Sequence, residues 1–287
     1  MFALFLLATI TASLLAACAS GGSTTPSTRR GPARRVVSLT PNTTEALFAI
    51  GAGGRVVGVS RYCDWPRDAA RLPKVGGYVD PSLEAILALR PDLVVGARGP
   101  SNRGVVDRLT ESGIATYFPL DRSLEDVYAL LLGLGDRVGR SGAARTLVTQ
   151  LRRDRAAVDR ALAGRHRPRT LLVYGYRPIV VAGPGGFADE LLRAAGADNV
   201  VRDGSAYPTI SLERVEALAP EVIVEARFSA HEDSLTTPEW HRLPTIPAVR
   251  DGRLVVLRDE RLIRPGPRVI EGVRVLASRL HPGVPLP

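Results

Sequence analysis

Cysteine, lysine and aromatic residues are scarce in this chain of 287 residues. It has two cysteines, Cys18 and Cys63, its only lysine is Lys74, and aromatic residues make up 5% of the sequence. Arginine therefore supplies nearly all the cationic charge behind a formal net charge of +9, and it is spread thinly along the chain, in pairs such as Arg29 and Arg30. No basic run is interleaved with aromatic residues, as nucleic-acid binders require. We therefore predict a solvated basic surface and no nucleic-acid partner.

Long apolar runs are missing as well, except at the N-terminus. Residues 1–17 are apolar and end in Leu15-Ala16-Ala17, directly before Cys18. A short apolar region followed by small residues is typical of an export signal. Leucine, two small residues and cysteine resemble the lipobox of bacterial lipoproteins, which implies that cleavage leaves Cys18 as a lipid-bearing N-terminus. Hydroxyl residues and marginal length argue against an uncleaved membrane helix.

The start of the chain departs from the usual signal in one respect. Residues 1–7 contain no Lys or Arg, so either translation starts upstream or the signal is atypical. Residues 18–33, which are mostly small and polar with Gly and Pro, predict a flexible tether. We therefore expect an exported protein, lipid-anchored to a membrane that faces the periplasm or the cell exterior.

Recognisable catalytic motifs are missing too. If Cys18 carries lipid, Cys63 has no disulfide partner, and we interpret it as a small buried hydrophobe. The glycine-rich stretches at 53–59 and 183–187 lack the lysine and the spacing of a phosphate loop, and no Ser-His-Asp set can be nominated. These absences argue against an enzyme, and we predict no cofactor; a metal-dependent or other enzyme is kept as an alternative.

Two further alternatives concern metals and structure. His231, Glu232, Asp233 and His241 could bind a hard or borderline cation, but they lie in a segment rich in Pro and Thr. We interpret them as solvated loop residues and predict no metal site. A purely structural or adhesive lipoprotein remains the other alternative.

Two passages of the sequence occur twice, in the same order. SLEAILALRPDLVV at 82–95 corresponds to SLERVEALAPEVIV at 211–224, and EALFAIGA from residue 45 corresponds to ELLRAAGA from residue 190. Each member of the second pair predicts a short helix that ends at a glycine, Gly51 or Gly196. Two such pairs in one order indicate two homologous lobes, and their period is far too long for a solenoid.

The intervening patterns predict an α/β fold. Compact apolar runs predict buried strands that alternate with helices, which indicates a mostly parallel sheet in each half. The expected strands are 36–39, 56–59, 93–95, 171–173, 222–224 and 254–257, and the expected helices are 45–50, 82–89, 189–195 and 211–218.

The middle of the chain has helical rather than strand-like periodicity. Apolar residues recur at helical spacing over 123–134 and 141–163, and the second helix would be about 35 Å long at ~1.5 Å per residue. We predict two homologous α/β lobes, residues 34–122 and 168–287, bridged by connecting helices at 123–167. The ligand cleft is expected between the lobes, at the carboxyl ends of the strands.

Four longer stretches carry a resemblance to a known family. They are RVVSLTPNTTEALFAIG, VVGVSRYCDWP, LPKVGGYVDPSLEAILALRPDLVV and RPIVVAGPGGFADELLRAAGADNVV, in this order. Residues 34–280 thus resemble the exported substrate-binding proteins of iron-siderophore, haem and cobalamin ABC importers, and the likeness is closest to the cobalamin-binding group. The resemblance implies that residues 34–287 form one binding domain, and that a monomer delivers its ligand to a permease dimer with its ATPase.

In this family each lobe presents one acidic residue that docks on arginines of the permease. The matching positions are Glu84 and Glu213, which are the same residue of the duplicated passage. A glutamate in the first turn of a helix also stabilises the helix through its interaction with the macrodipole, typically by ~0.3–1 kcal/mol. That effect explains either glutamate separately, but it does not explain why both passages have one.

The expected ligand-binding residues follow strands. The resemblance implies that Tyr62 and Tyr78 match aromatic positions that pack on the corrin ring. Arg98 follows a strand end and could contact amide or carboxyl groups, and Tyr176 follows the strand at 171–173. Flat aromatic rings suit a large, flat ligand. Trp65, which precedes Pro66, is interpreted as structural.

One segment departs from the cobalamin-binding pattern. Where an aromatic residue is expected, residues 258–268 offer Asp259, Glu260, Arg261 and Arg264. Charged groups would suit a polar ligand such as a ferric siderophore, whose anionic donors accept charge-assisted hydrogen bonds from arginine. We predict a cobalamin receptor, and the alternative is a siderophore or haem receptor of the same fold.

Overall fold

The computed structural model describes residues 31–99, 102–227, 240 and 242–287. Pro32–Pro287 forms one compact unit. The predicted signal peptide, Cys18 and most of the predicted tether lie outside the described residues. Within the described part, no helix combines the length and the apolar character needed to span a bilayer.

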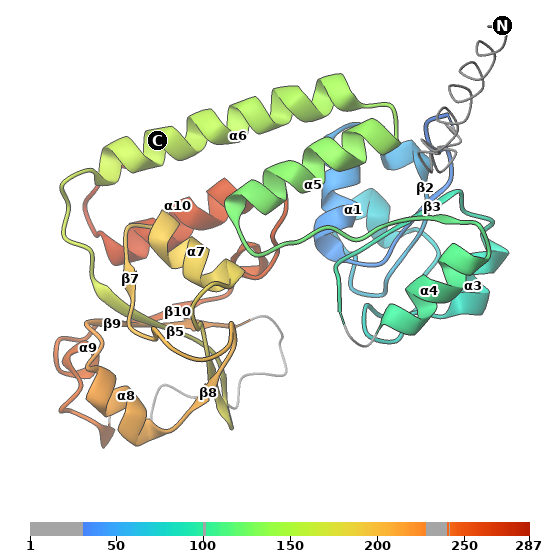
Figure 1. Cartoon of the computed structure of the whole chain (residues 1–287). Coiled ribbons are helices and arrows are strands. Elements are labelled where there is room, and N and C mark those ends of the chain that lie inside the picture. The colour runs from blue at the N-terminus through green and yellow to red at the C-terminus, as the bar shows by residue number, and fades with distance from the viewer. Residues whose placement is uncertain (1–30, 100–101, 228–239, 241) are drawn as a thin grey trace, which may run out of the picture. The chain divides into compact units, whose positions relative to one another are not determined.

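The first lobe is built on a four-stranded parallel sheet with the strand order β2-β1-β3-β4 (Figure 1). In the central strand β1, Val36 lies opposite Val56 on one side and Leu93 on the other. Strands β1 and β3 are fully buried, as expected of parallel strands covered on both faces. The strands are β1 (Val36–Ser38), β2 (Val56–Val59), β3 (Leu93–Val95) and β4 (Ala115–Tyr117), and the helices are α1 (Pro41–Ala49), η1 (Gly53–Arg55), α2 (Arg67–Ala70), α3 (Leu83–Ala88) and α4 (Arg103–Glu111).

The second lobe contains a six-stranded sheet with the order β10-β9-β5-β6-β8, and β7 pairs with β5. Strands β10, β9, β5 and β7 are parallel, whereas β6 runs antiparallel to both β5 and β8. The mostly parallel arrangement was predicted, but the antiparallel edge was not. The strands are β5 (Arg169–Tyr176), β6 (Ile179–Val181), β7 (Asp198–Asn199), β8 (Thr209–Ile210), β9 (Val222–Ala226) and β10 (Leu254–Leu257), and the helices are α7 (Phe187–Ala194), α8 (Leu212–Leu218), α9 (Pro247–Arg250), η5 (Glu260–Leu262) and α10 (Val269–Leu280).

Two long helices connect the lobes: α5 (Leu124–Arg137) and α6 (Ser141–Leu162). Ser123 starts α5 with a capping box, in which its hydroxyl accepts from the Asp126 amide at 3.1 Å and the Asp126 carboxylate accepts from the Ser123 amide at 3.0 Å. The predicted bridging helix at 141–163 is confirmed, and the 22 residues of α6 span about 33 Å. One continuous hydrophobic cluster runs from α1 through α5 and α6 to α7 and α10.

Helix α5 extends beyond its predicted end at residue 134 and includes two glycines of the glycine-containing stretch GLGDRVGR at 133–140. A Cβ atom at Gly133 would lie 2.1 Å from the Tyr117 hydroxyl oxygen, and one at Gly135 would lie 2.6 Å from the Cβ of Ala144. The glycines therefore allow close packing against β4 and α6 instead of ending the helix.

The duplicated passages fold alike in the two lobes. Helices α3 and α8 each begin after a serine, Ser82 or Ser211, whose hydroxyl accepts from the backbone amide three residues later, at 3.2 and 3.3 Å respectively. Each helix ends before a proline at a left-handed residue, Arg90 with φ of +45° and Ala219 with φ of +43°. A buried strand follows in both cases. The two predicted homologous lobes thus agree even in the backbone conformation of corresponding residues, as Arg90 and Ala219 show.

Candidate functional site

Tyr62 and Tyr78 form an exposed aromatic pair on the first lobe. Their ring centroids are 5.8 Å apart with the planes inclined by 60°, and the residues are 47% and 49% exposed. Tyr62 follows the carboxyl end of β2, where open α/β sheets bind ligands. Arg61 lies 5.8 Å from the Tyr62 ring centroid and forms an ion pair with Asp80 at 2.5 Å, which links the two tyrosine-bearing segments. The structure therefore brings these two predicted residues together.

Arg98 lies at the same end of the first sheet, just after β3. It is exposed, and its Nε donates to the carbonyl oxygen of Phe118, which follows β4, at 2.6 Å. The Asn102 side-chain amide donates to the carbonyl oxygens of Ala97 at 3.0 Å and Tyr78 at 3.5 Å. These bonds connect the segment that carries Tyr78 to the one that carries Arg98.

Tyr176 is placed differently from its expected position. Strand β5 continues three residues beyond the predicted strand and pairs with β6, so Tyr176 lies in a strand and is only 8% exposed. Its ring packs edge-on against Trp240, with the centroids 5.4 Å apart. The Trp240 indole donates to the Glu225 carboxylate at 2.6 Å, and Arg227 pairs with the same carboxylate at 2.7 Å. In this structure Tyr176 offers little surface to a ligand, and its ligand-binding role stays a prediction.

Two exposed aromatic residues were not included in the predicted site. Trp65, interpreted from the sequence as structural, is about half exposed, and the Arg268 guanidinium lies 5.0 Å from its ring centroid. Tyr207 is also about half exposed and contacts Tyr174 edge-on at 5.6 Å between centroids. Desolvation, with a smaller effect of Asp121, raises the pKa of Tyr207, so its phenol is neutral at physiological pH. Trp65 was interpreted as structural because it precedes Pro66. The sequence alone does not show that the Trp65 side chain is exposed, because its exposure depends on the fold.

A buried carboxylate joins the two lobes. Glu45 of α1, with a side chain 2% exposed, accepts two hydrogen bonds from Arg268, at 2.7 and 2.8 Å, and a third from Arg264 at 3.1 Å. Arg264 also pairs with Asp64 at 2.9 Å and with Glu260 at 2.5 Å. These five residues, the interlobe ion cluster, connect the segment before α10 to the first lobe.

The interlobe ion cluster revises the interpretation of residues 258–268. The sequence suggested that Asp259, Glu260, Arg261 and Arg264 would suit a charged ligand. Arg264 is instead held by three carboxylates, and Arg261 pairs with Asp259 at 2.5 Å and with Glu271 at 2.9 Å. These four residues therefore form ion pairs with one another, with Glu271 of α10 or with the first lobe.

Glu84 and Glu213 occupy the same position in the first turns of α3 and α8. Both side chains are exposed. A hydrogen bond with the Ser211 hydroxyl lowers the pKa of Glu213 below its ordinary value, which keeps this carboxylate charged in mildly acidic conditions. Each lobe thus presents one matched anionic group.

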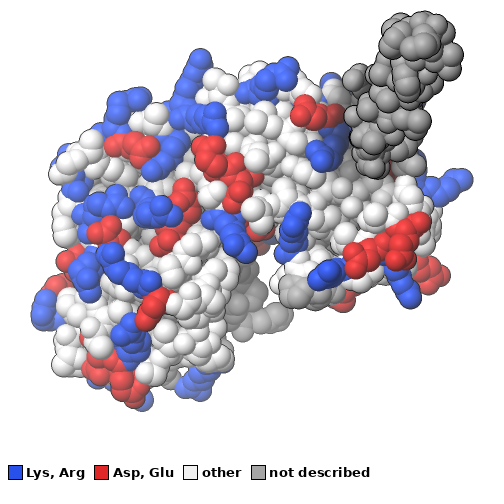
Figure 2. Space-filling view, in the orientation of Figure 1, with Lys and Arg blue, Asp and Glu red and all other residues white. Residues whose placement is uncertain are grey.

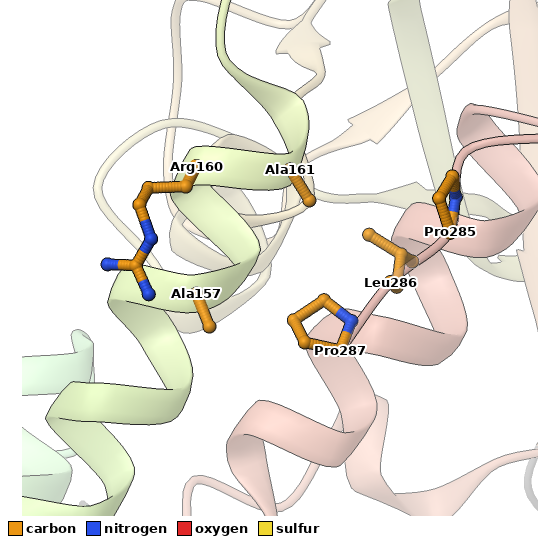
Figure 3. Close-up of a pocket in the computed structure, with 6 residues that line it drawn as sticks. All are labelled: Ala157, Arg160, Ala161, Pro285, Leu286 and Pro287. Atoms are coloured by element: carbon orange, nitrogen blue, oxygen red, sulfur yellow. The ribbon is translucent and has the colours of Figure 1, made fainter.

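Two pockets among the described residues lie apart from these side chains. A pocket of about 360 Å³ lies between α6 and the C-terminal residues 285–287 (Figure 3), and one of about 310 Å³ lies between α5, α6 and α7. Across the described part of the chain, no three His, Cys, Asp or Glu residues are grouped so that they could hold a metal ion. His231, Glu232, Asp233 and His241 lie outside the described residues, and His166 pairs with Glu221 at 2.8 Å.

Two α/β lobes connected by long helices, with aromatic side chains exposed at strand ends, define the class of two-lobe binding proteins. The sequence matches the family described as periplasmic binding protein over residues 36–260. The chain belongs to this family. A vitamin B12-binding protein of Salmonella typhimurium strain LT2 is 31% identical over 249 residues, which cover 86% of this chain and 90% of that protein.

Solved structures show the same fold. The periplasmic vitamin B12 binding protein of Vibrio cholerae has a TM-score of 0.77 at 24% identity, covering 87% of this chain and 97% of its own. The periplasmic haem-binding protein of Roseiflexus sp. RS-1, in its apo form, has a TM-score of 0.76 at 28% identity, and the match covers 87% of this chain and 98% of that protein's chain. The predicted family and the predicted two-lobe fold are thereby confirmed.

Proposed function

We propose that this chain is the substrate-binding component of an ABC importer and delivers a captured solute to the permease dimer and its ATPase. The observation that carries this proposal is the pair Glu84 and Glu213. Both are exposed, and each stands in the first turn of an equivalent helix, one per lobe. Two matched acids suit a partner made of two like subunits, and such charges raise the rate of encounter more than the affinity.

The proposed solute is cobalamin. Tyr62 and Tyr78 together present two half-exposed rings on one face, which suits a large, flat and partly apolar ligand. Aromatic contacts of this kind immobilise few side-chain torsions, so the ordering cost of binding is small. The relatives named as vitamin B12-binding proteins support this choice.

Haem is the second candidate. A tyrosine oxygen can ligate haem iron, and both exposed rings of the pair carry a phenol. A haem-binding protein at 28% identity has the same fold. A ferric siderophore is less favoured, because Arg264 is engaged by three carboxylates and offers little to an anionic ligand.

A fluorescence titration distinguishes these ligands. A soluble form, residues 19–287, is titrated with cyanocobalamin, haem and ferric siderophores, with correction for ligand absorption. Saturable quenching by cobalamin that is lost in Tyr62→Ala or Tyr78→Ala, but kept in Tyr62→Phe and Tyr78→Phe, supports stacking on cobalamin. Haem binding with an absorption spectrum that changes in a Tyr→Phe variant supports ligation of iron. Binding of neither would contradict both candidates.

Charge reversal tests the import role. Glu84→Arg and Glu213→Arg should each slow uptake and weaken association with the permease, while solute affinity in solution stays unchanged. The matched control is Glu111→Arg, which reverses another exposed glutamate of the first lobe. Equal uptake by all three variants would refute the docking role.

We further propose that Cys18 carries the lipid that holds the protein, as a monomer, at a membrane facing the periplasm or the cell exterior. Residues 1–17 would be removed, and residues 18–33 would tether the binding domain. Cys18→Ala should abolish incorporation of a labelled fatty acid into the protein. Mass spectrometry of the mature N-terminus would identify the lipid, and a free thiol at Cys18 would refute this assignment.

A further inference from the structure

The positive charge of this protein is concentrated on and beside α6. Residues 141–169 contain eight arginines, Asp154 and Asp159, and no other charged residue besides His166. About a tenth of the chain thus carries a net charge of +6, against +9 for the whole sequence. Arginine is spread thinly over most of the chain but is dense in this segment, and basic side chains follow the upper edge of Figure 2, where α6 runs.

Three of these arginines share the outward face of α6. Arg145, Arg153 and Arg160 are separated by eight and seven residues, close to two helical turns in each case, so they lie on one face. All three are exposed, and Thr149 and Ala156, which fall between them on that face, are uncharged. The buried face of the helix consists of Ala144, Val148, Leu151 and Val158. We call Arg145, Arg153 and Arg160 the α6 ridge.

The two acids of α6 are neutralised by other arginines. Asp154 pairs with Arg274 of α10 at 3.0 Å, and Asp159 pairs with Arg155 at 2.6 Å. Among the described residues, no acidic side chain forms an ion pair with an arginine of the α6 ridge. Figure 3 shows the Arg160 guanidinium directed away from the C-terminal residues. The ridge is therefore an uncompensated line of cations that extends over four helical turns.

The α6 ridge lies away from the proposed permease-docking residues. Helix α6 runs along the upper edge of Figure 1, whereas α3 and α8, which carry Glu84 and Glu213, lie in its lower half. The ridge is thus suited to a different partner, and one that is anionic. Guanidinium groups bind phosphate oxygens through paired hydrogen bonds, and a row of them suits an extended array of phosphates.

We propose that the α6 ridge binds the headgroups of anionic phospholipids and lays the protein on the bilayer surface when it is not docked. The ridge would be about 22 Å long, from 15 residues at ~1.5 Å each, so it spans several headgroups. The surface of an anionic bilayer presents negative charge along the whole length of the ridge, so its charge is complementary to all three arginines. This inference concerns a surface remote from the candidate solute site, so it does not depend on which solute is bound.

Vesicle sedimentation tests the proposal with residues 19–287, which lack the predicted anchor and contain the whole compact unit. Binding should require phosphatidylglycerol in phosphatidylcholine vesicles and should weaken as salt is added. Replacing all three ridge arginines with glutamine should weaken binding roughly a hundredfold, at about fivefold per arginine. The matched control replaces Arg71, Arg108 and Arg202, which are exposed and lie on other elements, and should change binding much less.

A site-specific probe provides an independent test. An environment-sensitive dye on Thr149→Cys, within the ridge, should shift its emission on anionic vesicles, while the same dye on Glu111→Cys should not; Cys63 is buried. No binding by the unmodified soluble form, equal losses in the two triple variants, or a silent probe at position 149 would each overturn the proposal. Solute affinity of the ridge variant, measured in parallel, shows separately whether the binding function is intact.

Discussion

Replacing Glu45 with glutamine should destabilise the protein, because its carboxylate is the shared anion of the interlobe ion cluster. The substitution keeps the shape of the side chain and removes the charge. Arg268 then loses a bidentate partner and Arg264 loses one of three carboxylates. Two guanidinium groups from the second lobe would face a neutral amide whose NH2 group cannot accept a hydrogen bond.

The expected loss follows from the exposure of each group. Removing one partner of a fully buried ion pair costs about 3–5 kcal/mol. The Glu45 side chain is fully buried at 2% exposed, and the Arg264 side chain is nearly so at 10%. Arg264, however, keeps its ion pairs with Asp64 and Glu260 when Glu45 is replaced. The Arg268 side chain is 25% exposed and contacts Trp65, so water replaces part of its interaction. We therefore expect a loss of about 2–3 kcal/mol.

Urea denaturation followed by circular dichroism measures this loss, and the duplicated sequence supplies the control. Glu190, which corresponds to Glu45 in the second lobe, pairs with Arg193 one turn away on the same helix at 2.8 Å. Glu190→Gln should cost less than about 0.5 kcal/mol, as for a surface ion pair. Equal losses at the two positions would refute the reasoning.

A double-mutant cycle makes the test specific to the contact. Glu45→Gln and Arg268→Gln should be non-additive by about 1 kcal/mol or more, because they remove the same interaction. Additive losses would mean that each residue acts through its own surroundings, and the interlobe contact would then not be the source of the stability.

Three further predictions concern the backbone and protonation. Ala219→Gly should raise the free energy of unfolding by up to about 1 kcal/mol, since glycine adopts a φ of +43° without strain; a lower melting temperature would contradict this. Ser211→Ala should lower it by about 0.5–2 kcal/mol through loss of the cap, and an NMR titration should show the pKa of Glu213 rising towards its ordinary value. Burial lowers the pKa of His281 below 6.5, so the unfolded state binds more protons just below that pH. Stability should therefore fall as pH drops from about 6.5 towards the folded pKa, and His281→Asn should flatten this slope in denaturation midpoints.

Local patterns made much of the fold predictable. The helix-to-strand passages at 82–95 and 211–224 and the long helix α6 carry their periodicity and their ends within the sequence itself. The short antiparallel strands β6 and β8, of three and two residues, are too short to show a pattern. Helix α10 was missed although its apolar residues recur at helical spacing, at Val269, Val273, Leu276 and Leu280, so this signal was available.

The candidate site was less predictable, because its geometry depends on distant partners. Tyr62 and Tyr78 were found through a family resemblance, and the structure adds their mutual contact. The burial of Tyr176 depends on Trp240, which is far away in the sequence. The bond from Arg268 to Glu45 joins residues 223 positions apart. No local pattern reveals which distant carboxylate will neutralise an arginine.

The left-handed residues Arg90 and Ala219 bear on the ancestry of the chain. Each ends the helix inside a passage of 14 residues that contains its own helix start, its own stop and the entry to a buried strand. A segment that encodes both of its boundaries can be copied without matching changes elsewhere, because nothing outside it has to dictate where the helix gives way to the strand. A segment of this kind can be duplicated within a gene and still fold. The two copies can then diverge in their outer strands while the left-handed residue that ends each helix is kept.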